Sequence, residues 1–386
     1  MITLTSADNA LKTFYLDAVT ESLDYKANPL LAQIGRSTAD VVGKDVKKLV
    51  RMGINGGMSA GSETGDLPMS STQNSVQFTS TLKNLYGTIS ITDKALRASS
   101  SDEGAFVNLL NNEMQSLIKS ASFNFGRMLY GDGQGLLCEV VKNNANNTLI
   151  VTDSRCVIEG MLVDFYMGDM PIAESEGLRI VSVNRETNEI AVSGNIGAVQ
   201  GGAKMYLQGA HGYELTGLKA IFEKNTLYGV DRTFTCALKP YMKDEVGEID
   251  ENTIQKAIDA IEENSGSKVN FIVCSWGVRR ALVEHYKQFK TMLPSMKIEG
   301  GFTALSFNGI PVVADRFCPA GTMYLLNTDD FKIYQLCDWK WLEGEDGKIL
   351  KQIPGKPMYT ATLVKYAELM CERPGGQGRL TGITEA

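Results

Sequence analysis

Histidine is scarce and cysteine is widely spaced in this sequence of 386 residues. There are two histidines, His211 and His285, and the closest of the seven cysteines, Cys138 and Cys156, are 18 residues apart. A structural zinc site needs closely spaced Cys or His pairs, and a disulfide framework is typical of short, cysteine-rich secreted chains. Neither pattern is present, so we interpret the cysteines as small buried hydrophobic residues with free thiols.

Motifs for phosphate and dinucleotide binding are also missing. The phosphate-binding pattern G-x-x-x-x-G-K-[ST] is absent, and the glycines within 131–135 follow a predicted helix, whereas a dinucleotide-binding turn follows a strand. Acidic pairs such as Glu262 and Glu263 lie in polar segments that are typical of a solvated surface. The sequence therefore predicts no catalytic residue, no cofactor, no metal ligand and no enzymatic activity.

No hydrophobic run approaches the roughly 18 apolar residues that a membrane-spanning helix needs, and the first residues lack the pattern of a secretory signal. Lysine and arginine number 38 and acidic residues number 45, so the net charge is 38 − 45 = −7. Proteins that bind nucleic acid through its phosphates usually carry a basic surface. Any contact with DNA is therefore expected to be local or weak.

The most informative segment is 41–92, where apolar residues alternate as they do in strands. The two alternating stretches are separated by 53–65, which holds five glycines, and together they predict a long two-stranded hairpin with a loose tip. The alternation slips by one residue near Lys83 and Asn84, which predicts a bulge or a sharp twist. Because an isolated hairpin is marginally stable, its apolar face needs cover. We slightly favour cover by another subunit over cover by the hairpin's own domain.

A cluster of basic residues lies on the first arm of this hairpin: Lys44, Lys47, Lys48 and Arg51. It fits two interpretations equally well. It could form a solubilising face that blocks unwanted edge pairing, or a positively charged surface that meets acidic residues of a neighbouring subunit. Before the hairpin, residues 1–40 resemble an arm, in which Leu30 and Leu31 have little nearby to pack against.

The remaining chain divides into a long helix, a β-rich stretch and a mixed part. An apolar residue recurs every three or four positions from Phe106 to Met128, which predicts a helix over 101–130. Six short strands within 136–209 predict a small antiparallel barrel or sandwich. Beyond it, predicted helices that begin at Asp250 and Ser275 alternate with short buried strands, so this part is α/β or α+β.

This order of elements resembles the major capsid protein family of tailed double-stranded DNA bacteriophages. The resemblance is most specific over about 270–383. It is carried by Phe271–Gly277 (FIVCSWG), Phe307–Asp315 (FNGIPVVAD), Pro319–Asn327 (PAGTMYLLN), Thr360–Met370 (TATLVKYAELM) and Pro374–Ile383 (PGGQGRLTGI). The composition of 359–372 favours a helix by propensity, but the resemblance implies a long strand there, and we follow the resemblance.

The resemblance implies an α+β fold and a division of the chain into named parts. These are an N-terminal arm (1–40), an extended hairpin loop (41–92), a peripheral domain with a long spine helix (93–135), a β-rich insertion domain (136–213), a peripheral connection (214–245), an axial domain (246–344) and a peripheral return (345–386). It also implies a function: self-assembly into pentamers and hexamers of an icosahedral shell around packaged DNA, in a virion capsid assembled in the host cytoplasm.

The resemblance further implies which residues and partners assembly uses. The expected inter-subunit residues are Lys47, Lys48, Arg51, Gly56, Gly57, Gly61, Gly65 and Phe78 in the hairpin and Phe14, Leu30 and Leu31 in the arm. The expected partners are copies of the chain, a portal, weakly contacted DNA and an optional decoration protein. Only about 40 residues precede the hairpin, so we expect a scaffold, if one is used, to be a separate protein. Although Lys47, Lys48 and Lys83 are available for covalent cross-links, we expect non-covalent shells.

Two alternatives remain open. The first is an encapsulin-like compartment shell, which shares the fold and encloses cargo protein in place of DNA. The second is an enzyme or a carbohydrate-binding protein that uses the β-rich insert. Particle content would separate the first alternative from a capsid, and a ligand bound in a polar cleft of 136–213 would support the second.

Overall fold

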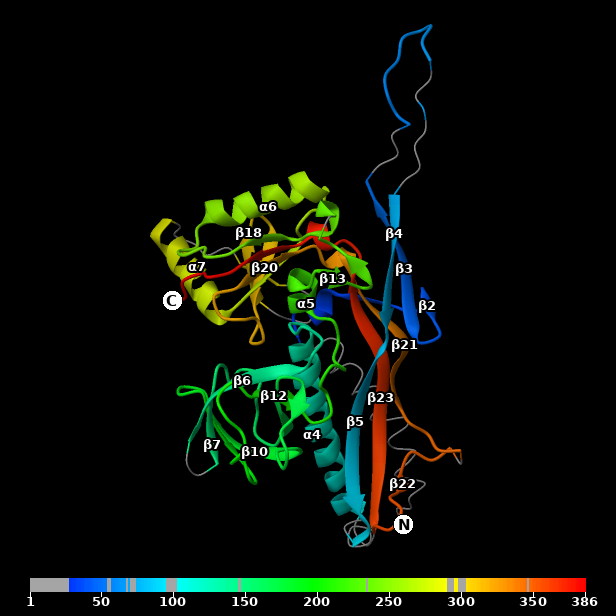
Figure 1. Cartoon of the computed structure of the whole chain (residues 1–386), viewed down its shortest axis with the longest axis vertical. Coiled ribbons are helices and arrows are strands. Elements are labelled where there is room, and N and C mark those ends of the chain that lie inside the picture. Colours follow the sequence, from blue (N-terminus) through cyan, green and yellow to red (C-terminus); the bar gives the residue numbers. More distant parts are fainter. Residues whose placement is uncertain are drawn as a thin grey trace.

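A computed structural model describes residues 28–53, 57–66, 69, 74–94, 103–144, 147–233, 235–289, 295–297, 303–345 and 347–386. The predicted interface residues Phe14 and Gly56 lie outside these residues, and so does the short helix that the sequence predicts after a cap at Asp8. Within them, an elongated sheet, a small barrel and a second mixed sheet surround the helix α4 (Glu103–Met128), as Figure 1 shows. No described helix combines the length and the hydrophobicity that a membrane span requires.

The elongated sheet forms one side of the molecule. Its central strand is β23 (Met358–Cys371), which pairs antiparallel with β5 (Lys83–Thr92), β21 (Phe331–Trp341) and β22 (Lys351–Gln352). The short strand β1 (Gly35–Ser37) runs parallel to β21 at the edge. The strand implied by the resemblance at 359–372 is therefore confirmed, and the helical propensity of this segment is overridden by pairing on both sides.

Helix α4 packs on this sheet along the stripe that the sequence predicts. Met114 and Phe125 are buried, and the ring of Phe125 meets the edge of Trp339 on β21 at 6.1 Å. Gly87 on β5 lies under the helix, where an added Cβ would come within 2.8 Å of Leu117 Cδ1. A glycine at this position thus allows the helix to approach the sheet closely.

The hairpin consists of β3 (Asp45–Met52) and β4 (Asn74–Thr81), with β2 (Val41–Val42) beside β3. It continues into β5, but the bulge predicted near Lys83 and Asn84 is wrong. At Leu82 the chain leaves the three-stranded sheet of β2, β3 and β4, and β5 pairs with β23 instead. The one-residue slip in the alternation marks this change of partner, because the face that needs cover changes as well.

The β-rich stretch forms a closed barrel. Its strands are β6 (Leu136–Asn144), β7 (Thr148–Val151), β8 (Leu162–Met167), β10 (Leu178–Asn184), β11 (Glu189–Val192) and β12 (Lys204–Leu207), with β9 (Met170–Pro171) added to β8. All pairs are antiparallel, and the pairing of β10 with β8 closes the ring. Of the two predicted forms, barrel and sandwich, the structure shows the barrel.

Two adjacent connecting segments join the barrel to the end of α4. The chain enters at 131–135 and leaves at 209–217, where Leu218 N donates to Leu129 O at 2.7 Å. An added Cβ on Gly217 would come within 2.4 Å of Met128 O and 2.6 Å of Gly131 O. Because these are backbone atoms, which cannot move away by a side-chain rotation, only glycine fits at position 217.

The second mixed sheet has the strand order β15 (Tyr241–Lys243), β24 (Gly378–Leu380), β20 (Met323–Leu326), β16 (Phe271–Cys274), β19 (Ile310–Ala314), β18 (Thr303–Phe307) and β17 (Ser295–Lys297). Residues 272 and 274 of β16 face a core with α6 (Glu251–Ser265) and α7 (Trp276–Phe289), while residues 271 and 273 face the main core. As predicted, Asp250 caps α6 by accepting from Thr253 N at 2.7 Å, and Ser275 Oγ accepts from Val278 N in α7.

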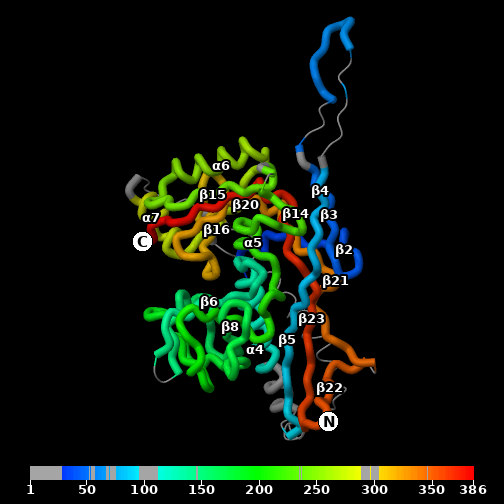
Figure 2. The backbone as a smooth tube through the Cα atoms, in the orientation of Figure 1, coloured from blue at the N-terminus to red at the C-terminus, as the bar shows by residue number. Residues whose placement is uncertain are grey.

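Short elements complete the chain: α5 (Leu218–Glu223), β13 (Thr226–Leu227), β14 (Val230–Asp231) and the 3-10 turns at Leu31–Gln33, Cys236–Leu238, Thr328–Asp330 and Pro374–Gly376. The expected division of the chain into named parts stays a prediction, and two strands pair across its boundaries. Strand β21, expected in the axial domain, belongs to the elongated sheet, and β24, expected in the peripheral return, belongs to the second sheet. Figure 2 shows how the chain passes between the two sheets near its C-terminal end.

Candidate interaction site

The hairpin is the candidate site, because it leaves the body of the molecule. Its strands pair in continuous register from Asp45 opposite Thr81 to Met52 opposite Asn74. Beyond this ladder, residues 57–66 lie far from the rest of the chain (Figure 1). Met58 is 95% exposed. Of the glycines in this stretch that were expected at an interface, Gly61 and Gly65 are exposed and Gly57 is half-buried. We call residues 57–66 the hairpin tip.

The base of the hairpin is anchored to its own chain. Val46 and Phe78 face inward and have no exposed surface. The Phe78 ring lies 5.4 Å from that of Tyr228, and Tyr228 O accepts from Thr79 N at 2.9 Å. The Tyr228 hydroxyl donates to Leu369 O and accepts from Cys371 N, both at 3.1 Å. Tyr228 therefore ties β4 to β23.

We expect replacement of Tyr228 with phenylalanine to lower the free energy of unfolding by about 1–3 kcal/mol, because Cys371 N and Leu369 O would lose their partner in a buried place. Urea unfolding measures this difference. The matched control is Tyr213→Phe, in which the removed hydroxyl belongs to a side chain that is 70% exposed. Equal stability of the two variants would contradict this role of Tyr228.

Charged groups also hold the base. Lys48 Nζ lies 2.8 Å from Asp40 Oδ2 and 3.7 Å from Glu372 Oε1, and Glu372 also accepts from Lys332 and from the Tyr334 hydroxyl. Burial opposes the charge on Glu372, but these contacts lower its pKa below the usual range. The hydrogen bond to Asp40 raises the pKa of Lys48. The acidic partners of Lys48 are thus in its own chain, so its expected role on a surface that meets a neighbour's acids is not supported.

The outward face of β3 differs. Lys47, Leu49 and Arg51 share this face and are exposed, and Leu49 is 60% exposed. A single exposed apolar side chain is common on protein surfaces, so Leu49 alone does not identify this face as an interface. For Lys47 and Arg51, the prediction of inter-subunit contact stays a prediction.

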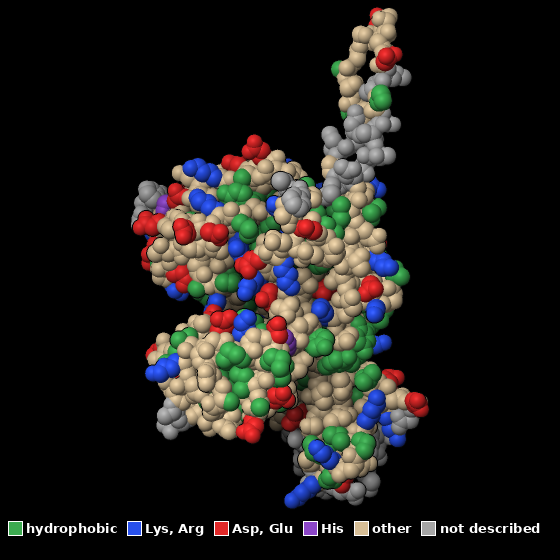
Figure 3. All heavy atoms as spheres, in the orientation of Figure 1, with side chains coloured by type: hydrophobic (Ala, Val, Ile, Leu, Met, Phe, Trp, Pro, Cys, Tyr) green, Lys and Arg blue, Asp and Glu red, His purple; other side chains and the backbone are tan. Residues whose placement is uncertain are grey.

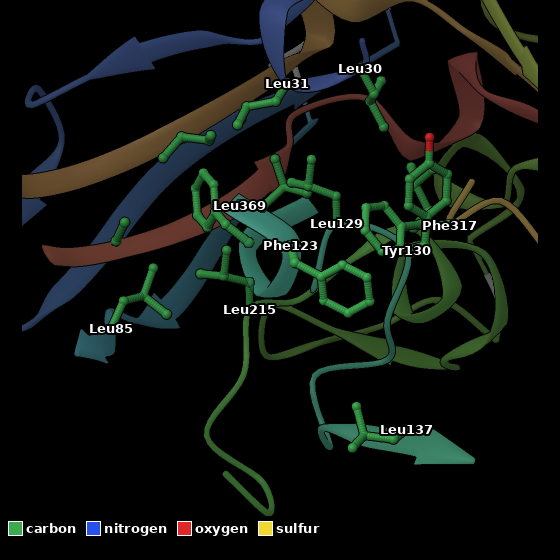
Figure 4. Packing of buried hydrophobic residues seen from close by; sticks show 14 of the residues in the cluster. Leu30, Leu31, Leu85, Phe123, Leu129, Tyr130, Leu137, Leu215, Phe317 and Leu369 are labelled. Carbon is green, nitrogen blue, oxygen red and sulfur yellow. The ribbon is translucent and has the colours of Figure 1, made fainter. Parts of the chain in front are cut away.

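Three of the predicted inter-subunit residues are covered by their own chain. Phe78 and Leu30 have no exposed surface, and Leu31 is 1% exposed. Figure 4 shows Leu30 and Leu31 within the same core as Leu129 and Leu369. The prediction that these side chains lack cover in a single molecule is wrong, because the residues that cover them are distant in sequence. The Asn28 side chain fixes the Leu30–Leu31 turn by accepting from Leu30 N at 2.7 Å.

Gly57–Gly61 (GMSAG) fits the G-x-S-x-G pattern of a serine nucleophile, but it lies in the hairpin tip and not in the strand-to-helix turn that positions such a serine. No group of three His, Cys, Asp or Glu side chains among the described residues could hold a metal ion. His211 stacks on Tyr166 with 4.6 Å between ring centroids and packs against Tyr206, which fixes the barrel exit to β8 and β12.

A groove of about 990 Å³ lies between α4, β5 and the barrel, and Leu117, Leu162, Tyr213 and Trp339 are among its lining residues. Figure 3 shows charges of both signs scattered over one face of the molecule, with hydrophobic side chains at the surface of the barrel and beside the elongated sheet. The exposed large apolar residues of these two regions include Leu162, Met167, Met170, Tyr213, Tyr86 and Leu336.

Comparison with known proteins gives similarity of structure but not of sequence. No family model and no curated protein match the chain. A chain of the Cyanophage A-1(L) capsid asymmetric unit is similar over 95% of this chain and 92% of its own length, with a TM-score of 0.56 and 10% identity.

Two further solved structures have lower TM-scores. The capsid of an empty GTA particle covers 94% of this chain and 90% of its own, at 12% identity and a TM-score of 0.49. An encapsulin complex from Synechococcus elongatus PCC 7942 covers 81% and 78%, at 8% identity and a TM-score of 0.44. From the first of the three, with its near-complete coverage of both chains, we conclude that this protein has the α+β fold of the Cyanophage A-1(L) capsid chain.

Proposed function

We propose that this chain is a structural subunit that assembles with copies of itself into an icosahedral shell enclosing double-stranded DNA. The observation that carries the proposal is the hairpin, whose base is fixed to the body while its tip extends beyond any surface of its own chain. The fold shared with a phage capsid chain supports it. Only another molecule can cover such a tip.

The rigid base gives the hairpin a defined direction. Phe78, Tyr228 and the Lys48 ion pairs hold it at the body, so that the tip is presented to a neighbour without the full ordering cost of a free loop. Each contact in a closed symmetric shell can be weak, because every subunit contacts several others. We include Lys47, Arg51, Gly57, Gly61 and Gly65 in this interface.

The same proposal includes the named parts of the chain, with strands β21 and β24 each pairing outside the part to which the resemblance assigned them. The insertion domain corresponds to the barrel at 136–213 and the spine helix to α4. The partners that we propose beyond copies of the chain are a portal, a separate scaffold, an optional decoration protein and DNA, in a virion assembled in the host cytoplasm. A net charge of −7 fits a shell that encloses DNA without binding it tightly.

Deletion of residues 57–66 tests the proposal. We expect the variant to remain folded, because residues 58–66 of the deleted stretch are exposed, and to lose at least about 90% of shell formation, since symmetric contacts are lost together. Cryo-electron microscopy of the concentrated protein counts the particles, and thermal unfolding checks the fold. The control is Met170→Ser, which changes an exposed barrel residue.

Two outcomes would contradict the proposal: a wild-type chain that stays monomeric at every concentration with and without the other capsid components, or a tip deletion that forms shells as well as the wild type. Correctly sized, uniform shells from the chain alone would show that no scaffold is needed. The content of particles purified from the native source, DNA or cargo protein, separates a capsid from an encapsulin-like compartment.

A further inference from the structure

A fully buried carboxyl group joins three separate segments of the chain. Glu368 lies on β23 and has no exposed surface. Its Oε1 accepts from Thr216 N at 2.8 Å and from Leu369 N at 3.0 Å, and its Oε2 lies 3.3 Å from Ser80 Oγ. Ser80 belongs to the base of the hairpin and Thr216 to the exit of the barrel. One side chain therefore connects the hairpin, the barrel exit and the central strand of the elongated sheet.

The charged groups around Glu368 leave it without an ion pair among the described residues. Lys83 at the start of β5 acts on it from a distance, and Lys83 Nζ itself donates to Gly212 O. Arg127 and Glu214, which lie near Thr216, form an ion pair with each other and not with Glu368. Tyr334 lies opposite Glu368 on β21, but its hydroxyl donates to Glu372.

Glu368 is the group in this cluster that changes its charge near neutral pH. Burial raises its pKa from 4.5 to about 7, although the Thr216 and Leu369 amides and Lys83 favour the charged form. Burial also raises the pKa of Tyr228 and of Tyr334, so that both stay neutral, while the pKa of Glu372 is lowered, so that it stays charged.

We propose that Glu368 is a proton-controlled latch that holds the base of the hairpin and the exit of the barrel on β23 and releases them when it ionises. In the protonated form, Oε2–H can donate to Ser80 Oγ while Oε1 accepts from the two amides, and no charge is buried. In the ionised form the charge has no cation beside it, so a local opening that admits water becomes more favourable. The latch depends only on contacts within the chain and stands independently of assembly.

The direction of the pH dependence follows from the raised pKa. The closed state holds its proton up to about pH 7, whereas an opened, hydrated carboxyl loses it near 4.5. The closed state is therefore favoured at low pH. The opening equilibrium grows as the pH rises through this window, by roughly 50-fold between pH 5 and pH 8 if opening fully hydrates the group.

Amide hydrogen exchange of the full chain, corrected for the intrinsic rate at each pH, measures this opening. The reporters are the amides of Thr79, which bonds Tyr228 O, and Thr216, and the internal reference is Asn270, whose amide bonds Leu326 O in the second sheet. We expect protection at the two reporters to fall by roughly 50-fold from pH 5 to pH 8 while the reference is unchanged.

Glu368→Gln should remove this pH dependence, and Glu372→Gln, which changes a carboxyl that does not titrate in the window, should keep it. Should Glu368→Gln fail to fold, the wild-type profile alone decides. Constant protection at Thr79 and Thr216 between pH 5 and pH 8 would overturn the latch, and so would an equal fall at Asn270. Neither result would bear on shell formation.

Discussion

Replacing Arg127 with methionine is expected to lower the free energy of unfolding by about 3–5 kcal/mol, which is typical of removing one partner from a buried ion pair. Arg127 in the last turn of α4 and Glu214 at the barrel exit are 4% and 2% exposed. The guanidinium donates to both carboxylate oxygens, with Nη1 2.9 Å from Oε2. Burial opposes the charge on Arg127, but Glu214 raises its pKa above the usual value.

The loss comes from the carboxylate left behind. Glu214 would be charged, buried and without its partner, so most of the cost is desolvation and not the value of the contact itself. The double variant Arg127→Met with Glu214→Gln should therefore recover much of the lost stability. The control is Lys219→Met, because Lys219 is 45% exposed and lies 3.7 Å from Asp132, and we expect it to cost about 1 kcal/mol or less.

Chemical denaturation of the three variants and the wild type measures these differences. Because the pair joins α4 to the barrel exit, local protection near 209–217 should fall with the loss of global stability. A single Arg127→Met variant no less stable than Lys219→Met would show that the pair contributes nothing to the fold.

Replacing Phe78 with alanine is expected to cost about 3–5 kcal/mol, because it leaves a cavity that the surrounding core cannot fill. Phe78 has no exposed surface and packs against Tyr228 in the anchor of the hairpin. Had the hairpin been covered only by a neighbouring subunit, as the sequence favoured, the same change would leave the isolated chain unaffected. The experiment thus tests the corrected position of the hairpin base.

The matched control is Leu49→Ala, on the outward face of the paired strand. Leu49 is 60% exposed, so its loss should change the stability of the isolated chain by about 0.5 kcal/mol or less. In assembled shells, Leu49→Ala could cost more stability than Phe78→Ala, because Leu49 belongs to the face that we propose for contact with another molecule. Equal unfolding free energies for Phe78→Ala and Leu49→Ala in the isolated chain would contradict the burial described above.

Local sequence patterns predicted elements well and partners poorly. The six barrel strands, the stripe of α4 and the caps at Asp250 and Ser275 follow from periodicity and from side-chain hydrogen bonds to nearby amides. These depend on residues a few positions apart. In contrast, the change of sheet at Leu82 was not predicted: the slip in alternation was interpreted as a bulge or a sharp twist, because a slip shows that the covered face changes but not which strand covers it.

Strand β23 shows most clearly what local sequence patterns do not predict. Its composition favours a helix, and the resemblance alone predicted a strand. It holds Lys365 with no exposed surface, 2.7 Å from Asp338 and 5.5 Å from the centre of the Trp339 ring. Nothing near Lys365 in sequence predicts these partners, and the same holds for Glu368 with Ser80 and Thr216.

The amino-acid sequence by itself determined where helices, strands and turns lie and that the chain carries a long glycine-rich hairpin. Only the tertiary structure decided that the base of this hairpin is buried in its own molecule, that the barrel closes, and that β21 and β24 lie in different sheets. The physical reason is the separation along the chain over which each interaction acts. Periodicity and capping act between neighbours in the chain, whereas burial and the satisfaction of buried charges depend on residues hundreds of positions away.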